Sequence, residues 1–238
     1  MTIALVADLH GNMTSVLALE KDLKDRGIHK IWCLGDLVGK GPSNDKTFDW
    51  AIANCEVVLC GNWDEGVGLQ QYVNDSFYFE QLGLERLKRL SLFPKEHHTR
   101  LSGRHIRLIH GRPVMESLLN PHLTPAKELE SLFQNKYQVV GFADTHRQSL
   151  RTLTKGILFN TGSVGNGLGV NMVQYVIIEG DENDHQAPFD IRFITLPYDI
   201  EQAVREAQAH PNMPNAQSFI HEIRSGIYAR KAIKSPKN

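Results

Sequence analysis

The chain has 238 residues, of which 41% are hydrophobic and 22% are charged, and its formal net charge is −1 at pH 7. These values are typical of a globular protein with a sizeable buried core, and they give no reason to expect general nucleic-acid binding. The N-terminus lacks the basic segment of a signal peptide, and no apolar run is long enough to cross a membrane. We therefore expect a cytoplasmic protein with no membrane association.

The cysteines are odd in number and form no CxxC pair, since only Cys33, Cys55 and Cys60 are present. This pattern indicates reduced thiols in a cytosolic protein and not a disulfide framework. Cys33 and Cys60 lie at the ends of apolar segments, so we expect them to pack as small core residues.

The first sixty residues alternate between expected strands and expected helices. Three short apolar segments are bounded by turn residues, which is typical of buried strands. Between them lie two helical segments that Thr14 and Ser43 are suited to cap. This repeat predicts parallel strands joined by helical crossovers. The expected strands are 2–7, 30–34 and 56–60, and the expected helices are 14–27 and 43–54.

The rest of the chain predicts a helical insertion followed by a strand-rich half. The insertion covers residues 64–94, and Ser102-Gly103-Arg104 predicts a hairpin turn. A basic tail over 231–238 is expected to fray. Expected strands are 97–101, 105–109, 137–142 and four antiparallel strands at 150–153, 157–160, 173–178 and 191–196; expected helices are 124–133, 200–209 and 217–227. Since there is no repeat or linker, we expect one domain over residues 1–238, an α/β (α+β) fold of two stacked mixed sheets flanked by helices.

Five polar clusters stand at the ends of five expected strands. Binding sites in open α/β sheets form at the carboxyl ends of strands. Each cluster also has an ordinary explanation by itself, as a helix cap, a turn or a surface histidine. Their recurrence instead favours a site for divalent transition ions, for which Mn, Fe, Zn, Ni and Co are all suitable. The clusters are DLHGN (8–12), GDLVGKGP (35–42), GNWD (61–64), HGRP (110–113) and ADTH (143–146).

In this order the clusters resemble the calcineurin-like metallophosphoesterase superfamily, whose pattern is D-x-H, GD, GN-H-D, H and G-H-x-H. The turn at 160–165 (NTGSVG) resembles the N-P-G-S-V-G turn of its small bacterial phosphodiesterases, which include diadenosine tetraphosphatase-like proteins. The resemblance covers roughly residues 1–210. It implies a four-layer sandwich and a metal-dependent phosphoric ester hydrolase, with a phosphodiesterase favoured over a monoesterase.

Carried over residue by residue, the resemblance implies two divalent ions, with Mn²⁺ favoured. The ions would share a bridging hydroxide that attacks phosphorus, and Asp36, Asn62 and His110 would be the catalytic residues. The first ion would be held by Asp8, His10, Asp36 and His146, and the second by Asp36, Asn62, His110 and, less directly, Asp144.

Trp63 and Asp144 depart from the family pattern. Trp63 replaces a histidine that is thought to protonate the leaving oxygen; the indole either contacts the substrate or packs at the pocket edge. General acid catalysis contributes ~10²–10⁴-fold, so we expect slow turnover or a preference for activated leaving groups. Asp144 replaces a histidine ligand. As a ligand it would lower the positive charge of the centre and favour a diester monoanion. In another alignment, Gly141-Phe142 stands at the family's Gly-His, and the second site would be disabled because Phe142 cannot bind metal.

We expect a small phosphorylated substrate, with nucleotides among the candidates. The expected substrate contacts are Asn12, Asn62, Trp63, Arg112 and Arg147, although the arginines are equally compatible with solvated loops. The alternative function is a degenerate member of the same fold that binds metal without catalysis and acts as a binding module. These motifs leave the natural substrate and the oligomeric state open.

Overall fold

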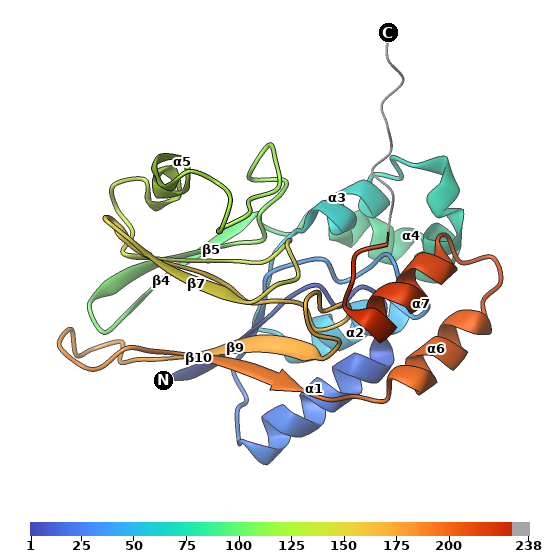
Figure 1. Cartoon of the computed structure of the whole chain (residues 1–238), viewed down its shortest axis with the longest axis horizontal. Coiled ribbons are helices and arrows are strands. Elements are labelled where there is room, and N and C mark those ends of the chain that lie inside the picture. Colours follow the sequence, from blue (N-terminus) through green and yellow to red (C-terminus); the bar gives the residue numbers. More distant parts are fainter. Residues whose placement is uncertain (230–238) are drawn as a thin grey trace, which may run out of the picture.

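Two five-stranded mixed sheets form the centre of the molecule, and helices cover their outer faces (Figure 1). The computed structural model describes residues 1–229, so the expected frayed tail at 231–238 lies outside the described residues. The strand order is β10-β9-β1-β2-β3 in the first sheet and β4-β5-β6-β8-β7 in the second. The predicted α/β class with two flanked mixed sheets is confirmed.

The first sheet is built from the N-terminal strand–helix repeat and two later strands. As expected, β1, β2 and β3 run parallel, with α1 and α2 as the crossovers. β9 pairs antiparallel with β1, and β10 pairs antiparallel with β9. The bounds are β1 Thr2–Val6, β2 Ile31–Cys33, β3 Val57–Val58, β9 Val173–Glu179, β10 Asp190–Leu196, α1 Met13–Asp25 and α2 Asn44–Asn54.

The second sheet starts with the predicted hairpin, in which β4 and β5 turn at Ser102 and Gly103. β5, β6 and β8 are parallel, and β7 pairs antiparallel with β8. The expectation that residues 157–160 form an antiparallel strand is wrong for one of the two pairings of β8. This strand is parallel to β6, because the β7–β8 hairpin returns the chain to lie beside β6. The bounds are β4 Glu96–Leu101, β5 Arg104–Ile109, β6 Val139–Phe142, β7 Ser149–Leu153 and β8 Gly156–Asn160.

Alternation along the strands divides the core into layers. In β1, Ile3 and Leu5 pack against residues of the second sheet, whereas Ala4 and Val6 face the helices, as the two-residue period of a strand requires. A third cluster, which includes Phe142, covers the outer face of the second sheet. Cys33 and Cys60 are buried thiols, as expected.

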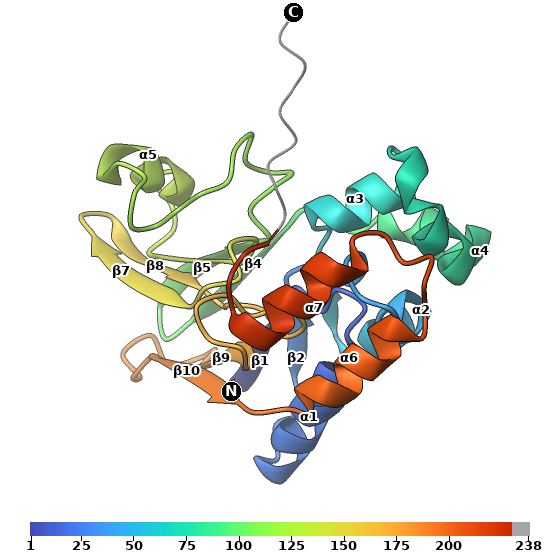
Figure 2. The ribbon, with the colours of Figure 1, turned by 45° about the vertical axis from the view of Figure 1, so that its right-hand side comes forward.

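The remaining helices lie on opposite sides of the two sheets (Figure 2). α6 and α7 lie with α1 and α2 on the first sheet, while α5 and a 3₁₀ turn at Ser131–Phe133 cover the second. The segment expected to be a helical insertion contains α3 and α4 joined by a 3₁₀ turn at Val73–Asp75, and α4 is interrupted at Gly83 (φ 68°); that it is an insertion stays a prediction. The bounds are α3 Asn62–Gly68, α4 Ser76–Leu90, α5 Ala126–Glu130, α6 Ile200–Gln208 and α7 Ala216–Ser225.

The start of α1 differs from the expectation. The helix begins at Met13, and the Asn12 side chain accepts a hydrogen bond from Ser15 N. Thr14 instead donates to Glu206 on α6 (3.0 Å). Asn12 caps the helix in place of Thr14 because its side-chain amide supplies both an acceptor for the helix N–H group and a donor for the loop opposite. Within residues 1–229, no helix has the length and apolarity that a membrane span requires.

Candidate metal centre

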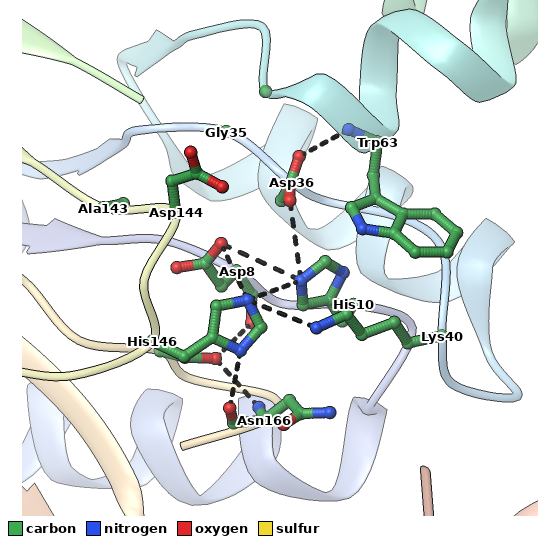
Figure 3. A network of polar contacts seen from close by, with 12 residues as sticks. Asp8, His10, Gly35, Asp36, Lys40, Trp63, Ala143, Asp144, His146 and Asn166 are labelled. Atoms are coloured by element: carbon green, nitrogen blue, oxygen red, sulfur yellow. Dashed lines mark hydrogen bonds and ion pairs between the residues drawn. The ribbon is translucent and has the colours of Figure 1, made fainter. Parts of the chain in front are cut away.

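The carboxyl ends of strands from both sheets meet at one place, where the predicted ligands gather. Asp8 follows β1, Asp36 follows β2, and His110 follows β5. Asp8, His10 and His146 point toward one another in Figure 3, and Asp36 lies above them. Asp8, His10 and His110 are fully buried.

The first ligand group is Asp8, His10 and His146. Asp8 Oδ1 lies 3.8 Å from His10 Nε2 and 3.5 Å from His146 Nε2. The two histidine Nε2 atoms are 3.1 Å apart. Three potential ligand atoms thus converge from two different sheets.

The second ligand group is Asp8, Asp36 and His110. His110 Nε2 lies 3.8 Å from Asp8 Oδ1 and 3.3 Å from Asp36 Oδ2. Asp36 Oδ2 is also 3.5 Å from His10 Nε2, so it contacts a histidine of each group, as its predicted bridging role requires. Asp8 belongs to both groups as well, which the sequence argument did not anticipate.

The histidine rings are oriented by backbone carbonyls. Nδ1 lies 3.0 Å from Val38 O in His10, 2.8 Å from Leu34 O in His110, and 2.7 Å from Asn166 O in His146. A carbonyl only accepts, so each Nδ1 carries a proton, and Nε2 is the nitrogen that each ring presents to the cluster. This is how proteins orient histidines that bind metals.

Several buried acceptors at the cluster have no hydrogen-bond partner among residues 1–229. They are both carboxylate oxygens of Asp8, Asn62 Oδ1 and His110 Nε2. An unsatisfied buried acceptor costs about 1–3 kcal/mol, and such groups require an explanation such as a bound ion. The donor set of carboxylate, imidazole and amide oxygen therefore fits divalent transition ions.

Charge within the cluster is strongly coupled. Burial raises the pKa of Asp8 well above its usual value, and the charges of Asp36 and Asp144 raise it further. Burial alone would lower the pKa of His110, but the charge of Asp36 and that of Asp8 raise it to about 10. The carboxylates therefore attract positive charge, which a divalent ion supplies.

The backbone at the ligands is held in an unfavourable conformation. Asp8 (φ 55°), His10 (φ 46°), Asp36 (φ 55°) and His146 (φ 57°) all adopt the left-handed region. This region costs roughly 1–3 kcal/mol for a non-glycine residue and is concentrated at functional sites. Cross-loop bonds hold it, because Asp8 N donates to Gly35 O and His10 N to Asp36 O.

Asp144 lies beside the cluster but outside both ligand groups. Its carboxylate accepts two side-chain hydrogen bonds from Arg112, at 2.9 Å from Nε and 2.6 Å from Nη2. Burial raises the pKa of Asp144, but the bonds and charges of Arg112 and His110 outweigh it and the net pKa is lowered. Phe142, the alternative in the other alignment, is buried in the outer core of the second sheet and does not reach the cluster.

Trp63 packs at the edge of the cluster. Its backbone N–H donates to Asp36 Oδ1 (2.8 Å), and its ring meets His10 edge to face at 5.9 Å between centroids. A Cβ on Gly39 would collide with the indole, so the loop and the ring are tightly apposed. The geometry supports the packing interpretation, in which Trp63 fixes the Asp36 loop.

Two predicted substrate contacts have neighbours outside the ligand groups. Asn12 uses its oxygen to cap α1, and its Nδ2 donates to Gly165 O (2.8 Å). Its amide therefore joins α1 to the 160–165 turn. Arg147 is exposed and its Nη1 lies near Gly169. Substrate contact stays a prediction for both residues.

Sequence reasoning missed three residues that shape the centre. Lys40 is buried, and its Nζ lies 3.4 Å from His146 Nε2 (Figure 3). Asp64 accepts from Asp36 N, Leu37 N and Gly61 N, and thereby joins two motifs; burial and the charge of Asp36 raise its pKa to about 7. Glu222 accepts from Asn166 Nδ2 (2.8 Å). Two of the three lie in quoted motifs, Lys40 between two glycines of the Asp36 motif and Asp64 at the end of GNWD, whereas no motif contains Glu222.

The fold and this centre define a protein whose two sheets present metal-ligand side chains at their shared carboxyl edge. The family model for the calcineurin-like phosphoesterase superfamily domain matches residues 1–183. The chain therefore belongs to that superfamily.

Individual relatives are similar to this chain along most of its length. An uncharacterized protein of Methanocaldococcus jannaschii is 28% identical over 227 residues, which cover 84% of this chain and 89% of the relative. A metallophosphoesterase from Sphaerobacter thermophilus has the same fold (TM-score 0.73, 20% identity), with 95% of this chain and 100% of that chain covered. So has a hypothetical protein from Pyrococcus horikoshii (TM-score 0.76, 19% identity), with 96% and 99% covered.

Proposed function

We propose that this protein is a phosphoesterase that uses two divalent metal ions, with Mn²⁺ favoured, to hydrolyse a phosphodiester or phosphoanhydride. The observation that carries the proposal is the convergence of three correctly oriented histidine Nε2 atoms on two buried carboxylates. Superfamily membership supports the same reaction class.

Each ligand group has enough donors for one ion. Asp8, His10 and His146, with Asp36 beside them, would hold the first, whereas Asp36, His110, Asp8 and the amide oxygen of Asn62 would hold the second. When bound, two such ions lower the pKa of water toward ~7 and neutralise charge on phosphate oxygens. The Nδ1 bonds orient each Nε2 toward the ion sites, and burial keeps the carboxylates out of bulk water.

The substrate preference follows from charge and from the missing acid. Lys40 brings positive charge to the cluster and Arg112 presents a guanidinium beside it, which suits a small phosphorylated substrate, with nucleotides among the candidates. Trp63 has no useful acid pKa, so the leaving group departs with little proton transfer. Anhydrides and aryl esters, whose leaving groups are stable anions, are therefore the substrates expected to react fastest.

The direct test is Mn²⁺-dependent hydrolysis of bis-p-nitrophenyl phosphate, measured beside p-nitrophenyl phosphate. Asp36→Ala should lose both metal ions and turnover, because Asp36 contacts both ligand groups. Asp25→Ala removes a carboxylate from an exposed surface pair with Lys21 and serves as the matched control with unchanged rate.

Each outcome has a distinct meaning. Turnover that disappears in Asp36→Ala but not in Asp25→Ala supports the proposal, and the ratio of the two substrates' rates separates diesterase from monoesterase. Full metal content without turnover of either ester or of a nucleoside anhydride would refute the enzyme and favour the binding module.

A further inference from the structure

Arg112 and Asp144 form a two-pronged ion pair at the edge of the second ligand group. Arg112 Nε donates to Asp144 Oδ2 (2.9 Å) and Nη2 to Oδ1 (2.6 Å), while the Arg112 backbone N–H also reaches Oδ2 (3.2 Å). Parallel bonds of this kind are strong and fix the orientation of the guanidinium plane. Both carboxylate oxygens of Asp144 are therefore occupied by one cation.

The pair stands where two parallel strands end side by side. Gly111, which follows β5, has φ 140°, and a Cβ there would lie 2.8 Å from Asp144 Cβ. This close approach places Arg112 directly next to the carboxylate. His110, a member of the second ligand group, precedes Gly111, so the guanidinium is anchored two residues from a ligand histidine.

The two partners differ in exposure. The Asp144 side chain is 3% exposed, whereas that of Arg112 is 38% exposed. The carboxylate is thus the buried anchor, and the guanidinium is the part that solvent and an incoming anion reach. Its third nitrogen, Nη1, donates no hydrogen bond to any residue within 1–229.

Charge balance favours this arrangement over a third carboxylate ligand. Asp144 paired with Arg112 contributes no net charge, so two divalent ions would face only the carboxylates of Asp8 and Asp36. A ligand role would require Asp144 to leave a bidentate partner and would leave Arg112 unpaired beside two cations. Asp144 then does not lower the positive charge of the metal centre, so the preference for a monoanionic diester that was expected from such a ligand has no basis.

We propose that Asp144 is a positioning residue and not a metal ligand, and that it holds Arg112 so that Nη1 binds a non-bridging oxygen of the substrate phosphate. The inference rests on the proposed function, since it takes a phosphate ester as the substrate of this cluster. It assigns to the Arg112–Asp144 pair the role of an arginine clamp fixed by a buried carboxylate.

The test measures two quantities that need no turnover, metal content and affinity for inorganic phosphate, on Mn²⁺-loaded protein by elemental analysis and calorimetry. Arg112→Met and Asp144→Asn should both keep the wild-type metal content. Each should weaken phosphate binding by about 10- to 100-fold, the size of a lost charge-assisted hydrogen bond. The double variant should bind phosphate no more weakly than Arg112→Met, because both substitutions disrupt the same arginine–carboxylate pair.

Matched variants keep the test decisive. Arg86 forms the same two-pronged pair with Asp49 (2.8 and 2.7 Å), and its side chain is 35% exposed. Arg86→Met should therefore leave phosphate affinity unchanged. Arg112→Lys keeps the positive charge but lacks the two parallel N–H donors of the guanidinium. It should fold, and its phosphate affinity should lie between those of the wild type and Arg112→Met.

Three results would overturn the proposal. Loss of one ion in Asp144→Asn would make Asp144 a metal ligand, and unchanged phosphate affinity in Arg112→Met would show that Arg112 does not bind the phosphate. A double variant whose loss of phosphate affinity is the sum of the two single losses would show that the two residues act separately. Failure of the proposed function is distinguishable. It would appear as absent turnover in a wild-type protein that still binds Mn²⁺ and phosphate.

Discussion

The two ligand groups share Asp8 but are held by different parts of the molecule. In the second group, His110 Nδ1 bonds Leu34 O at the end of β2, so the ring is fixed by the two sheets themselves. In the first group, His146 Nδ1 bonds Asn166 O. Asn166 is in turn held by Glu222 of α7, which also accepts from Ala229 N. The first group therefore depends on the C-terminal helix, whereas in the second group His110 is held by a sheet end and Asp36 by Trp63 and Asp64 of α3.

In the proposed two-ion centre, this difference predicts that the affinity for each ion is adjustable separately. A carboxylate behind a ligand's hydrogen-bond partner acts on metal affinity through the orientation of that ligand. Glu222 has this position for the first group. The second group has the Arg112–Asp144 pair as its neighbour, which acts on the substrate and not on the ion in our proposal.

The largest effect is expected where the two groups overlap. Asp8→Asn removes the carboxylate common to both groups, so the variant should lose tight binding of both Mn²⁺ ions and fall to background hydrolysis. Metal content after dialysis is the measurement, with Asp25→Asn as the control. A variant that keeps one ion at wild-type affinity would show that the groups are independent.

Removal of the metal should lower thermal stability. A ligand at a hundredfold its Kd stabilises the native state by ~2.7 kcal/mol, which corresponds to a rise in Tm of about 5–10 °C for a chain of this size. Calorimetry with Mn²⁺ and with a chelator measures the difference, and Asp8→Asn should show none. An equal shift in that variant would place the stabilising ion elsewhere.

Glu222→Gln should affect the first group alone. The substitution keeps the shape but removes the charge that holds Asn166, and changes of this kind cost about 10- to 100-fold in metal affinity. Isothermal titration with Mn²⁺ should resolve one weakened and one unchanged site. Equal weakening of both sites would contradict separate support of the two groups.

Asn12→Ala should give the smallest effect, and one on stability. Loss of the α1 cap and of the bond to Gly165 O should lower the free energy of unfolding by about 1–2 kcal/mol. Chemical denaturation measures this change. Phosphate affinity of the Mn²⁺-loaded variant tests the predicted substrate contact separately: a tenfold loss supports it, and an unchanged value leaves Asn12 with the structural role alone.

Local patterns in the sequence predicted most of the strands and several of the polar residues that the structure brings together. Short apolar strands, each followed by Asp, Asn or His, fixed the order of β1, β2 and β3 and the convergence of Asp8, Asp36 and His110. These features depend only on neighbours in the chain. The parallel pairing of β8 with β6 was missed because pairing is decided by distant residues.

The functions of several polar side chains also depended on distant partners. Asp144 was predicted to be a ligand from its place in a motif, yet its carboxylate is paired with Arg112, 32 residues away. Glu222 is 56 residues from Asn166, and no motif contains it. Sequence motifs therefore identify reactive side chains more readily than they identify the charged partner of each side chain in the fold.

The central claim is that two adjacent ion sites share the carboxylates of this cluster. Electron paramagnetic resonance of the protein loaded stepwise with Mn²⁺ tests it most directly. At two equivalents, ions in a shared site should give a spin-coupled spectrum, because the two metals of such centres lie about 3.5–4 Å apart. Saturation at one equivalent, or two equivalents with the six-line spectrum of isolated ions, would contradict the account.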